Sequence, residues 1–152
     1  LAILLNYIFN MKIGVIGGGV WGSALARLLS NNKVYIFARD NKVVKSINDH
    51  HFNPKLKYAV FNDNVSAEIN FDLINEMDYV FITLPSQNIR EVFSSIKFNN
   101  KKIDLIIASK GIEIDTTYFL SQVVKECTES EKISILTGPS FSNEVAQNLP
   151  TA

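Results

Sequence analysis

The sequence contains few of the residues on which metal sites and disulfides depend. Its 152 residues include one cysteine and two histidines. Cys127 has no second cysteine for an intramolecular disulfide, which is typical of a protein that works in the reducing cytoplasm. His50 and His51 are adjacent, so their side chains should leave a helix end in different directions, and neither has an evident partner. We therefore expect no metal site and no disulfide.

The chain also lacks a net charge and a long apolar run. Fifteen basic and fifteen acidic side chains are scattered along it, so no surface for nucleic acid or for a membrane is evident. The apolar residues 1–10 are too few to span a bilayer and do not resemble a signal peptide. We interpret them as a non-native or disordered extension before a start at Met11; a short apolar arm that packs on the domain is the alternative.

The remaining residues, 11–152, have the pattern of one domain in which strands alternate with helices. Hydrophobic residues make up 47% of the chain, which is enough for a substantial core. Short apolar runs predict six strands, at residues 12–16, 33–37, 65–69, 78–84, 104–109 and 133–136. Helical patterns begin at residue 20 and cover residues 41–49, 72–76, 89–96, 116–126 and 141–147. This alternation predicts an α/β fold with a doubly wound, mostly parallel sheet of the Rossmann type.

A glycine-rich turn follows the first predicted strand and opens the first helix. Gly17, Gly19 and Gly22 form the pattern G-x-G-x-x-G. The first glycine permits the tight turn, the second lets a pyrophosphate approach the backbone, and the third lets helix and strand pack closely. Such turns also occur in loops that bind nothing, but here the strand, the helix and a second strand follow one another at βαβ spacing. We therefore predict a dinucleotide site.

The end of the second strand should select the dinucleotide. A carboxylate there binds the ribose 2′-hydroxyl of NAD, whereas arginine accommodates the 2′-phosphate of NADP. Here the corner reads Ala38-Arg39-Asp40, and Asp40 is better interpreted as the cap of the next helix. Arg39 predicts that NADPH is accepted and is preferred over NADH, unless this side chain is simply a solvated loop arginine.

Two later strands end in residues that should face the same cleft. Pro85 and Ser86 follow the strand at 78–84, and Lys110 and Gly111 follow the strand at 104–109. Ligands of open α/β sheets lie beyond the carboxyl ends of the strands, so these residues should border the ligand. A surface lysine beside a turn is the alternative for Lys110.

Several segments together resemble the amino-terminal half of bacterial NAD(P)-dependent glycerol-3-phosphate dehydrogenases. They are Gly17-Gly-Gly-Val-Trp-Gly-Ser-Ala-Leu-Ala26, Phe37-Ala-Arg-Asp40, Leu84-Pro-Ser86, Ser109-Lys-Gly-Ile-Glu113, Gly138-Pro-Ser-Phe-Ser-Asn-Glu-Val-Ala146 and Pro150-Thr-Ala152. The resemblance implies reduction of dihydroxyacetone phosphate to sn-glycerol 3-phosphate with NADPH or NADH, a step that supplies phospholipid synthesis.

The resemblance also implies roles for individual residues. Val20, Trp21, Arg39 and Ser142 would contact the cofactor beside the glycine loop, although the family usually has alanine at the position of Ser142. Lys110 would touch both cofactor and substrate as a catalytic residue. Gly138 and Ser140 would hold substrate, and Ser140 would alternatively cap a helix.

Relatives of this family continue into a helical carboxy-terminal domain, with a second catalytic lysine and much of the homodimer contact, that this chain does not contain. We therefore interpret the chain as a truncated or split Rossmann domain. Two other interpretations remain open: an inactive dinucleotide-binding remnant of the enzyme, and a related β-hydroxyacid or ketopantoate-type dehydrogenase domain.

Overall fold

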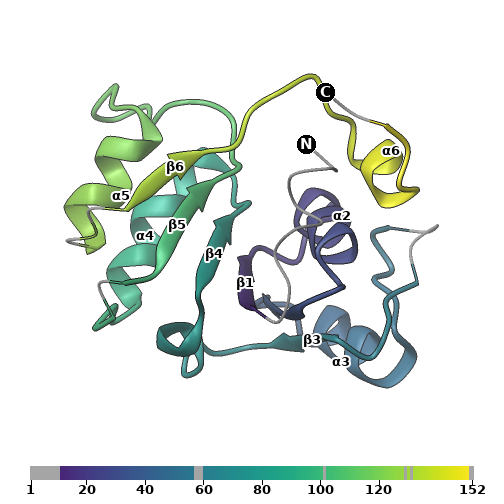
Figure 1. The fold of residues 1–152 in the computed structure, drawn as a ribbon. Coiled ribbons are helices and arrows are strands. Elements are labelled where there is room, and N and C mark those ends of the chain that lie inside the picture. The colour runs from purple at the N-terminus through teal and green to yellow at the C-terminus, as the bar shows by residue number, and fades with distance from the viewer. Residues whose placement is uncertain (1–10, 57–59, 101, 129, 131, 151–152) are drawn as a thin grey trace.

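The computed structural model describes residues 11–56, 60–100, 102–128, 130 and 132–150, which form an α/β fold around one sheet (Figure 1). The strands are β1 (Lys12–Ile16), β2 (Lys33–Phe37), β3 (Val65–Glu68), β4 (Tyr79–Ile82), β5 (Asp104–Ile107) and β6 (Ile133–Ile135). The helices are α2 (Val20–Leu28), α3 (Asn41–His50), α4 (Ile89–Ser95), α5 (Leu120–Thr128) and α6 (Ser142–Ala146), with 3-10 turns η1 (Ile74–Glu76) and η2 (Ser86–Asn88). The predicted extension at residues 1–10, and Thr151 and Ala152 of the last motif, lie outside the described residues.

The sheet has six strands in the order β3-β2-β1-β4-β5-β6, and every neighbouring pair is parallel. The chain builds outward from β1 to β3, then crosses over and builds the other half from β4. The predicted doubly wound Rossmann architecture is therefore confirmed. The strand order reverses between β1 and β4, and in such sheets ligands bind in the crevice at this switch point.

Each face of the sheet carries its own hydrophobic core. Side chains alternate along a strand, so Ile13 and Val15 of β1 face α2 and α3, while Ile16 faces α4 and α5. Figure 1 shows these two pairs of helices on either side of the strands. Because both faces are covered, the strands are continuous apolar runs, which is why the sequence predicts them well.

The segment after β5 differs most from the prediction. A helix was expected over residues 116–126, but α5 begins only at Leu120. Thr117 has a φ of 60°, which a helix does not allow, and Ile112 pairs with Phe119 in an isolated antiparallel bridge. The chain therefore makes a hairpin-like excursion before the helix starts.

Strands β4 and β5 are shorter than the predicted 78–84 and 104–109, and the expected helix at 72–76 is only the turn η1. Thr83 and Ser109 lie just beyond the strand ends, and their hydroxyls donate to the carbonyls of Ile16 and Leu84 respectively. These side-chain hydrogen bonds thus add to the backbone bonds between strands where the cleft begins.

The single cysteine and one of the two histidines have partners in the structure. Cys127 lies in α5 and packs against the core on that face, as expected. His51, expected to have no partner, lies with Nε2 3.7 Å from Asp63 Oδ1. Within the described ranges, no helix has both the length and the apolar character that crossing a bilayer requires.

Candidate functional site

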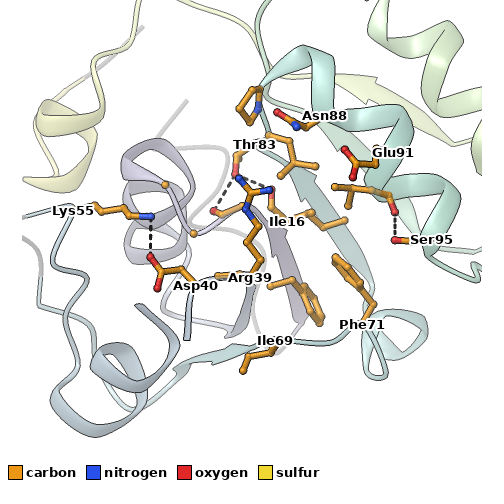
Figure 2. Close-up of a pocket in the computed structure, with 18 residues that line it drawn as sticks. Ile16, Arg39, Asp40, Lys55, Ile69, Phe71, Thr83, Asn88, Glu91 and Ser95 are labelled. Carbon is orange, nitrogen blue, oxygen red and sulfur yellow. Dashed lines mark hydrogen bonds and ion pairs between the residues drawn. The ribbon is translucent and has the colours of Figure 1, made fainter. Parts of the chain in front are cut away.

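A cleft of about 570 Å³ opens at the switch point between β1 and β4. Figure 2 shows its walls: the glycine loop (residues 17–19) after β1, the end of β2, the end of β4 and one side of α4. The cleft is therefore where the parallel topology predicts a ligand. Its lining includes both the glycine loop and a group of charged and aromatic side chains.

Three glycines shape the loop in three different ways. Gly17 has a φ of 125°, and a Cβ there would lie 2.6 Å from Thr83 Oγ1. A Cβ on Gly22 would collide with the carbonyl of Gly17, whereas a Cβ on Gly19 would meet nothing within 4 Å. The predicted turn and close helix packing are therefore present, and the backbone at Gly19 is open to the cleft.

Buried polar side chains fix the glycine loop from behind. Asn53 is fully buried, and its Nδ2 donates to Gly18 O at 3.1 Å and to Ser23 Oγ at 2.6 Å. On the other side, Thr83 Oγ1 donates to Ile16 O at 2.9 Å. These neutral hydrogen bonds hold the loop without placing an anion beside it.

The loop leads directly into the amino terminus of α2. Gly19 is its N-cap residue and offers no side chain to the first N–H groups, and the first turn carries no acidic residue. Unpaired N–H groups and the helix dipole favour an anion at such an end. Val20 and Trp21 occupy the first turn, so the predicted contacts surround a site with the electrostatics that a pyrophosphate needs.

The far end of the cleft carries charged groups beside an aromatic wall. Phe37 and Phe71 stack there with ring centroids 5.5 Å apart. Asp40 caps α3, as predicted, by accepting a hydrogen bond from the Lys42 N–H at 3.0 Å. This bond, with a smaller contribution from Lys55, lowers the pKa of Asp40. Arg39 is exposed at this end of the cleft.

Lys110 projects from a corner, residues 109–113, that we call the lysine corner. Ser109 Oγ donates to the carbonyls of Ile82 at 3.1 Å and Leu84 at 2.6 Å, and Gly111 has a φ of 112°. Gln87 clamps the next residues, donating to Ile112 O at 2.8 Å. The exposed Lys110 side chain therefore stands on a well-fixed backbone.

An ion-pair network closes the lysine corner. Arg90 of α4 donates to both carboxylate oxygens of Glu113, at 2.8 and 2.9 Å, and to Glu126 of α5 at 2.8 Å. The bond from Arg90, followed by one from Thr116, lowers the pKa of the Glu113 carboxyl to about 2. The same carboxylates raise the pKa of Arg90. The corner is thus joined to two helices on the opposite face from α2.

A small cavity of about 10 Å³ connects the lysine corner with the glycine-loop helix. Its walls include Trp21, Lys110, Gly138 and Ser140. Trp21 Nε1 donates to Ala108 O at 2.9 Å, across the top of the sheet. The structure therefore brings Trp21 next to all the predicted substrate residues, Lys110, Gly138 and Ser140. Lys110 was predicted to face the large cleft, but it is not among the residues that line it.

The predictions for Ser142 and Ser140 differ from what the structure shows near α6. Ser142 opens α6, which packs on α2 through Val145 and Ala146, and it lines neither cavity. The alternative role of Ser140 as a helix cap is wrong, because the N-cap residue of α6 is Phe141 and no side chain caps it. Pro85 borders the large cleft as expected, whereas Ser86 lies outside its walls.

Comparison with known proteins identifies the family. The model of the NAD-dependent glycerol-3-phosphate dehydrogenase N-terminus matches residues 12–152. The chain belongs to this family of glycerol-3-phosphate dehydrogenases. It is 39% identical over 141 residues to glycerol-3-phosphate dehydrogenase [NAD(P)+] of Neorickettsia sennetsu, which covers 90% of this chain and 42% of the relative. The corresponding enzyme of Erythrobacter litoralis is 35% identical, over 93% of this chain and 43% of its own length.

A solved glycerol-3-phosphate dehydrogenase of Coxiella burnetii has a TM-score of 0.86 and 27% identity. The match covers 95% of this chain and 46% of that one. The chain therefore spans less than half the length of these dehydrogenases. The family match favours the predicted dehydrogenase over the related ketopantoate-type alternative.

Sequence reasoning missed the residues that hold this dehydrogenase half in shape. Asn53, Thr83 and Arg90 were not predicted as part of the site. Asn53-Pro54 is a turn signal, but nothing local indicates that its amide would reach Gly18, 35 residues earlier. Within the described part of the chain, no group of three or more potential metal ligands is found.

Proposed function

We propose that this chain is the dinucleotide-binding half of an NAD(P)-dependent glycerol-3-phosphate dehydrogenase. The reaction is hydride transfer from NADPH or NADH to C2 of dihydroxyacetone phosphate, giving sn-glycerol 3-phosphate for phospholipid synthesis. The observation that carries the proposal is the bond from Trp21 Nε1 to Ala108 O, which ties the glycine-loop helix to the strand end that bears Lys110.

The fit of the cleft to a dinucleotide supports the cofactor. Gly17 and Gly22 permit the tight turn and the close helix packing, and Gly19 leaves the backbone accessible where a pyrophosphate would meet the start of α2 beside Val20 and Trp21. Arg39 would meet the adenosine end, and the Phe37–Phe71 wall offers an apolar surface for the base. Ser142 is retained as a cofactor contact on the family resemblance alone.

When bound, the nicotinamide supplies the hydride, and the chain's own residues provide binding and charge. The ammonium of Lys110 stabilises the negative charge that develops on the C2 oxygen, and it attracts the phosphoester of the substrate. Gly138 and Ser140 hold the substrate beside it. The family resemblance assigns proton donation to a lysine of the carboxy-terminal domain.

The proposal also covers the setting of the enzyme. The resemblance implies a cytoplasmic homodimer that acts on small phosphoesters, without metal and without contact to nucleic acid or membranes. The single cysteine is consistent with a reducing compartment.

Cofactor binding can be tested on this chain directly. Trp21 is the only tryptophan, so energy transfer from its fluorescence to the reduced nicotinamide reports binding near α2. We expect quenching of Trp21 and saturable heat in calorimetry with NADPH or NADH. No heat with either coenzyme on folded protein would overturn the proposal.

Turnover requires the remaining half of the enzyme. We expect dihydroxyacetone phosphate to be reduced when this chain is co-expressed with the carboxy-terminal half of a curated relative. Binding without turnover in that complex would instead establish the inactive remnant. For the fluorescence experiment, a Trp21→Phe variant is the control, because it removes the donor of energy transfer.

A further inference from the structure

The cleft that Arg39 lines contains a second cation, Lys55. Lys55 lines the same cavity, from the turn that follows α3 (Figure 2). The backbone of this turn is fixed, because the Lys55 N–H donates to Oδ1 of the buried Asn53 at 3.0 Å. The side chain itself is half-exposed, so its ammonium can move over a short range.

The neighbouring carboxylate is already engaged through both oxygens. Asp40 Oδ1 accepts the capping bond from the Lys42 N–H, and Asp40 Oδ2 lies 3.5 Å from Lys55 Nζ. A carboxylate that reads a ribose 2′-hydroxyl must have an oxygen free to accept from it. In this arrangement Asp40 is engaged with its own helix and with Lys55, and Arg39 adds a second cation to the lining.

We propose that Arg39 and Lys55 together form a seat for the 2′-phosphate of NADP(H), and that Lys55 exchanges its ion pair with Asp40 for this phosphate. The proposal rests on the proposed function and adds the residue that decides between the two coenzymes. Lys55 is thus a specificity-determining residue, and this chain selects NADP(H) over NAD(H).

The exchange is favourable because the competing ion pair is weak. Both side chains of this pair are about half-exposed, and exposed lysine–carboxylate pairs contribute little to stability because solvent screens them. A phosphate monoester carries up to two negative charges and three acceptor oxygens, so it outcompetes a carboxylate for the ammonium. Arginine supplies a planar fork and lysine a point charge, which lets the two side chains bind different oxygens.

The experiment compares NADP⁺ and NAD⁺ affinities by calorimetry on the purified chain and on matched variants. For Lys55→Gln we expect NADP⁺ affinity to fall about tenfold, or about 1.4 kcal/mol, while NAD⁺ affinity changes less than twofold. Lys55→Arg should restore most of the loss. Asp40→Asn keeps a capping side chain but releases Lys55, and it should raise NADP⁺ affinity about threefold.

Lys45→Gln is the control, because it removes an exposed charge from α3, the helix that precedes the Lys55 turn, at a position outside the cavity. Lys45→Gln should leave the ratio of NADP⁺ affinity to NAD⁺ affinity unchanged. If Lys45→Gln and Lys55→Gln change this ratio equally, the effect comes from the net charge of the protein, and the proposal is overturned. The affinities for adenosine 2′,5′-bisphosphate and 5′-AMP give the same comparison for ligands that lack the nicotinamide half.

The outcomes separate this inference from the proposed function. If the wild-type chain binds neither coenzyme, the proposed function fails. If it binds both, and Lys55→Gln leaves their ratio unchanged or NAD⁺ binds more tightly, only the assignment of Lys55 fails. Thermal unfolding of each variant verifies that a lost affinity is not lost folding.

Discussion

The glycine loop and the lysine corner lie at the same edge of the sheet, yet different forces hold them. The loop is fixed by neutral hydrogen bonds from the buried Asn53 and the partly buried Thr83. The corner is fixed by an ion-pair network between Arg90, Glu113 and Glu126, of which Arg90 and Glu126 are partly exposed.

This difference suits what each region is proposed to bind. A buried carboxylate behind the loop would repel a pyrophosphate, and Asn53 carries no charge. At the corner, Glu113 lies three residues from Lys110, but Arg90 neutralises it through two hydrogen bonds. The charge of Lys110 is therefore left for the ligand. Four predictions test this division, from the largest expected effect to the smallest.

Replacing Lys110 should remove chemistry and leave the loop intact. In the complex with a carboxy-terminal half, we expect Lys110→Ala to lower turnover by about 10²–10³-fold, because the developing alkoxide loses its counter-charge. Coenzyme affinity should change by less than about tenfold, or about 1.4 kcal/mol. Steady-state kinetics and calorimetry measure both, with Lys125→Ala on α5 as the control. Near-normal turnover would refute the role of Lys110.

Two glycine variants should separate packing from ligand approach. Gly22→Ala places a methyl group against the Gly17 carbonyl, so we expect the free energy of unfolding to fall by about 3 kcal/mol. Gly19→Ala meets nothing within 4 Å, so stability should hold while dinucleotide affinity drops. Urea unfolding and calorimetry measure the pair. Equal destabilisation by both variants would contradict the assigned roles.

Removing the amide behind the loop should weaken both folding and binding. Asn53→Ala leaves Gly18 O without its donor in a buried site, which costs about 2 kcal/mol of unfolding free energy. The loop should then be less ordered and bind NADPH more weakly. Asn62→Ala, which removes an exposed amide bonded to Ser30, is the control in urea unfolding. An unchanged stability would show that Asn53 does not anchor the loop.

The lysine corner should respond to acid. The folded pKa of Glu113 is about 2 against an ordinary value of 4.5, so its contribution to stability is complete above about pH 4.5. It is lost as the pH falls from there towards 2. The stability difference between wild type and Glu113→Gln should therefore shrink across this range. A difference that stays constant in urea midpoints would contradict the assignment.

The sequence predicts the sheet and the glycine turn because their causes are local. Largely apolar runs mark strands β1, β2, β4 and β5, and their predicted ends fall within two residues of the observed ones. Residues 116–119, the last part of the excursion, were predicted as the start of a helix over residues 116–126. The true path of the excursion depends on the bridge from Ile112 to Phe119 and on Glu113, which Arg90 holds from another helix.

What the sequence determined by itself is the order of the strands' hydrophobic segments, the tight turn after β1 and the Arg39 and Lys110 corners, all of which follow from neighbours in the chain. Only the tertiary structure decided which polar groups meet. Trp21 reaches Ala108 across 87 residues, Asn53 reaches Gly18 across 35, and Arg90 reaches Glu113 across 23. The path of the chain through the sheet brings these partners together, and polar groups that packing withdraws from water must find their hydrogen bonds within the protein.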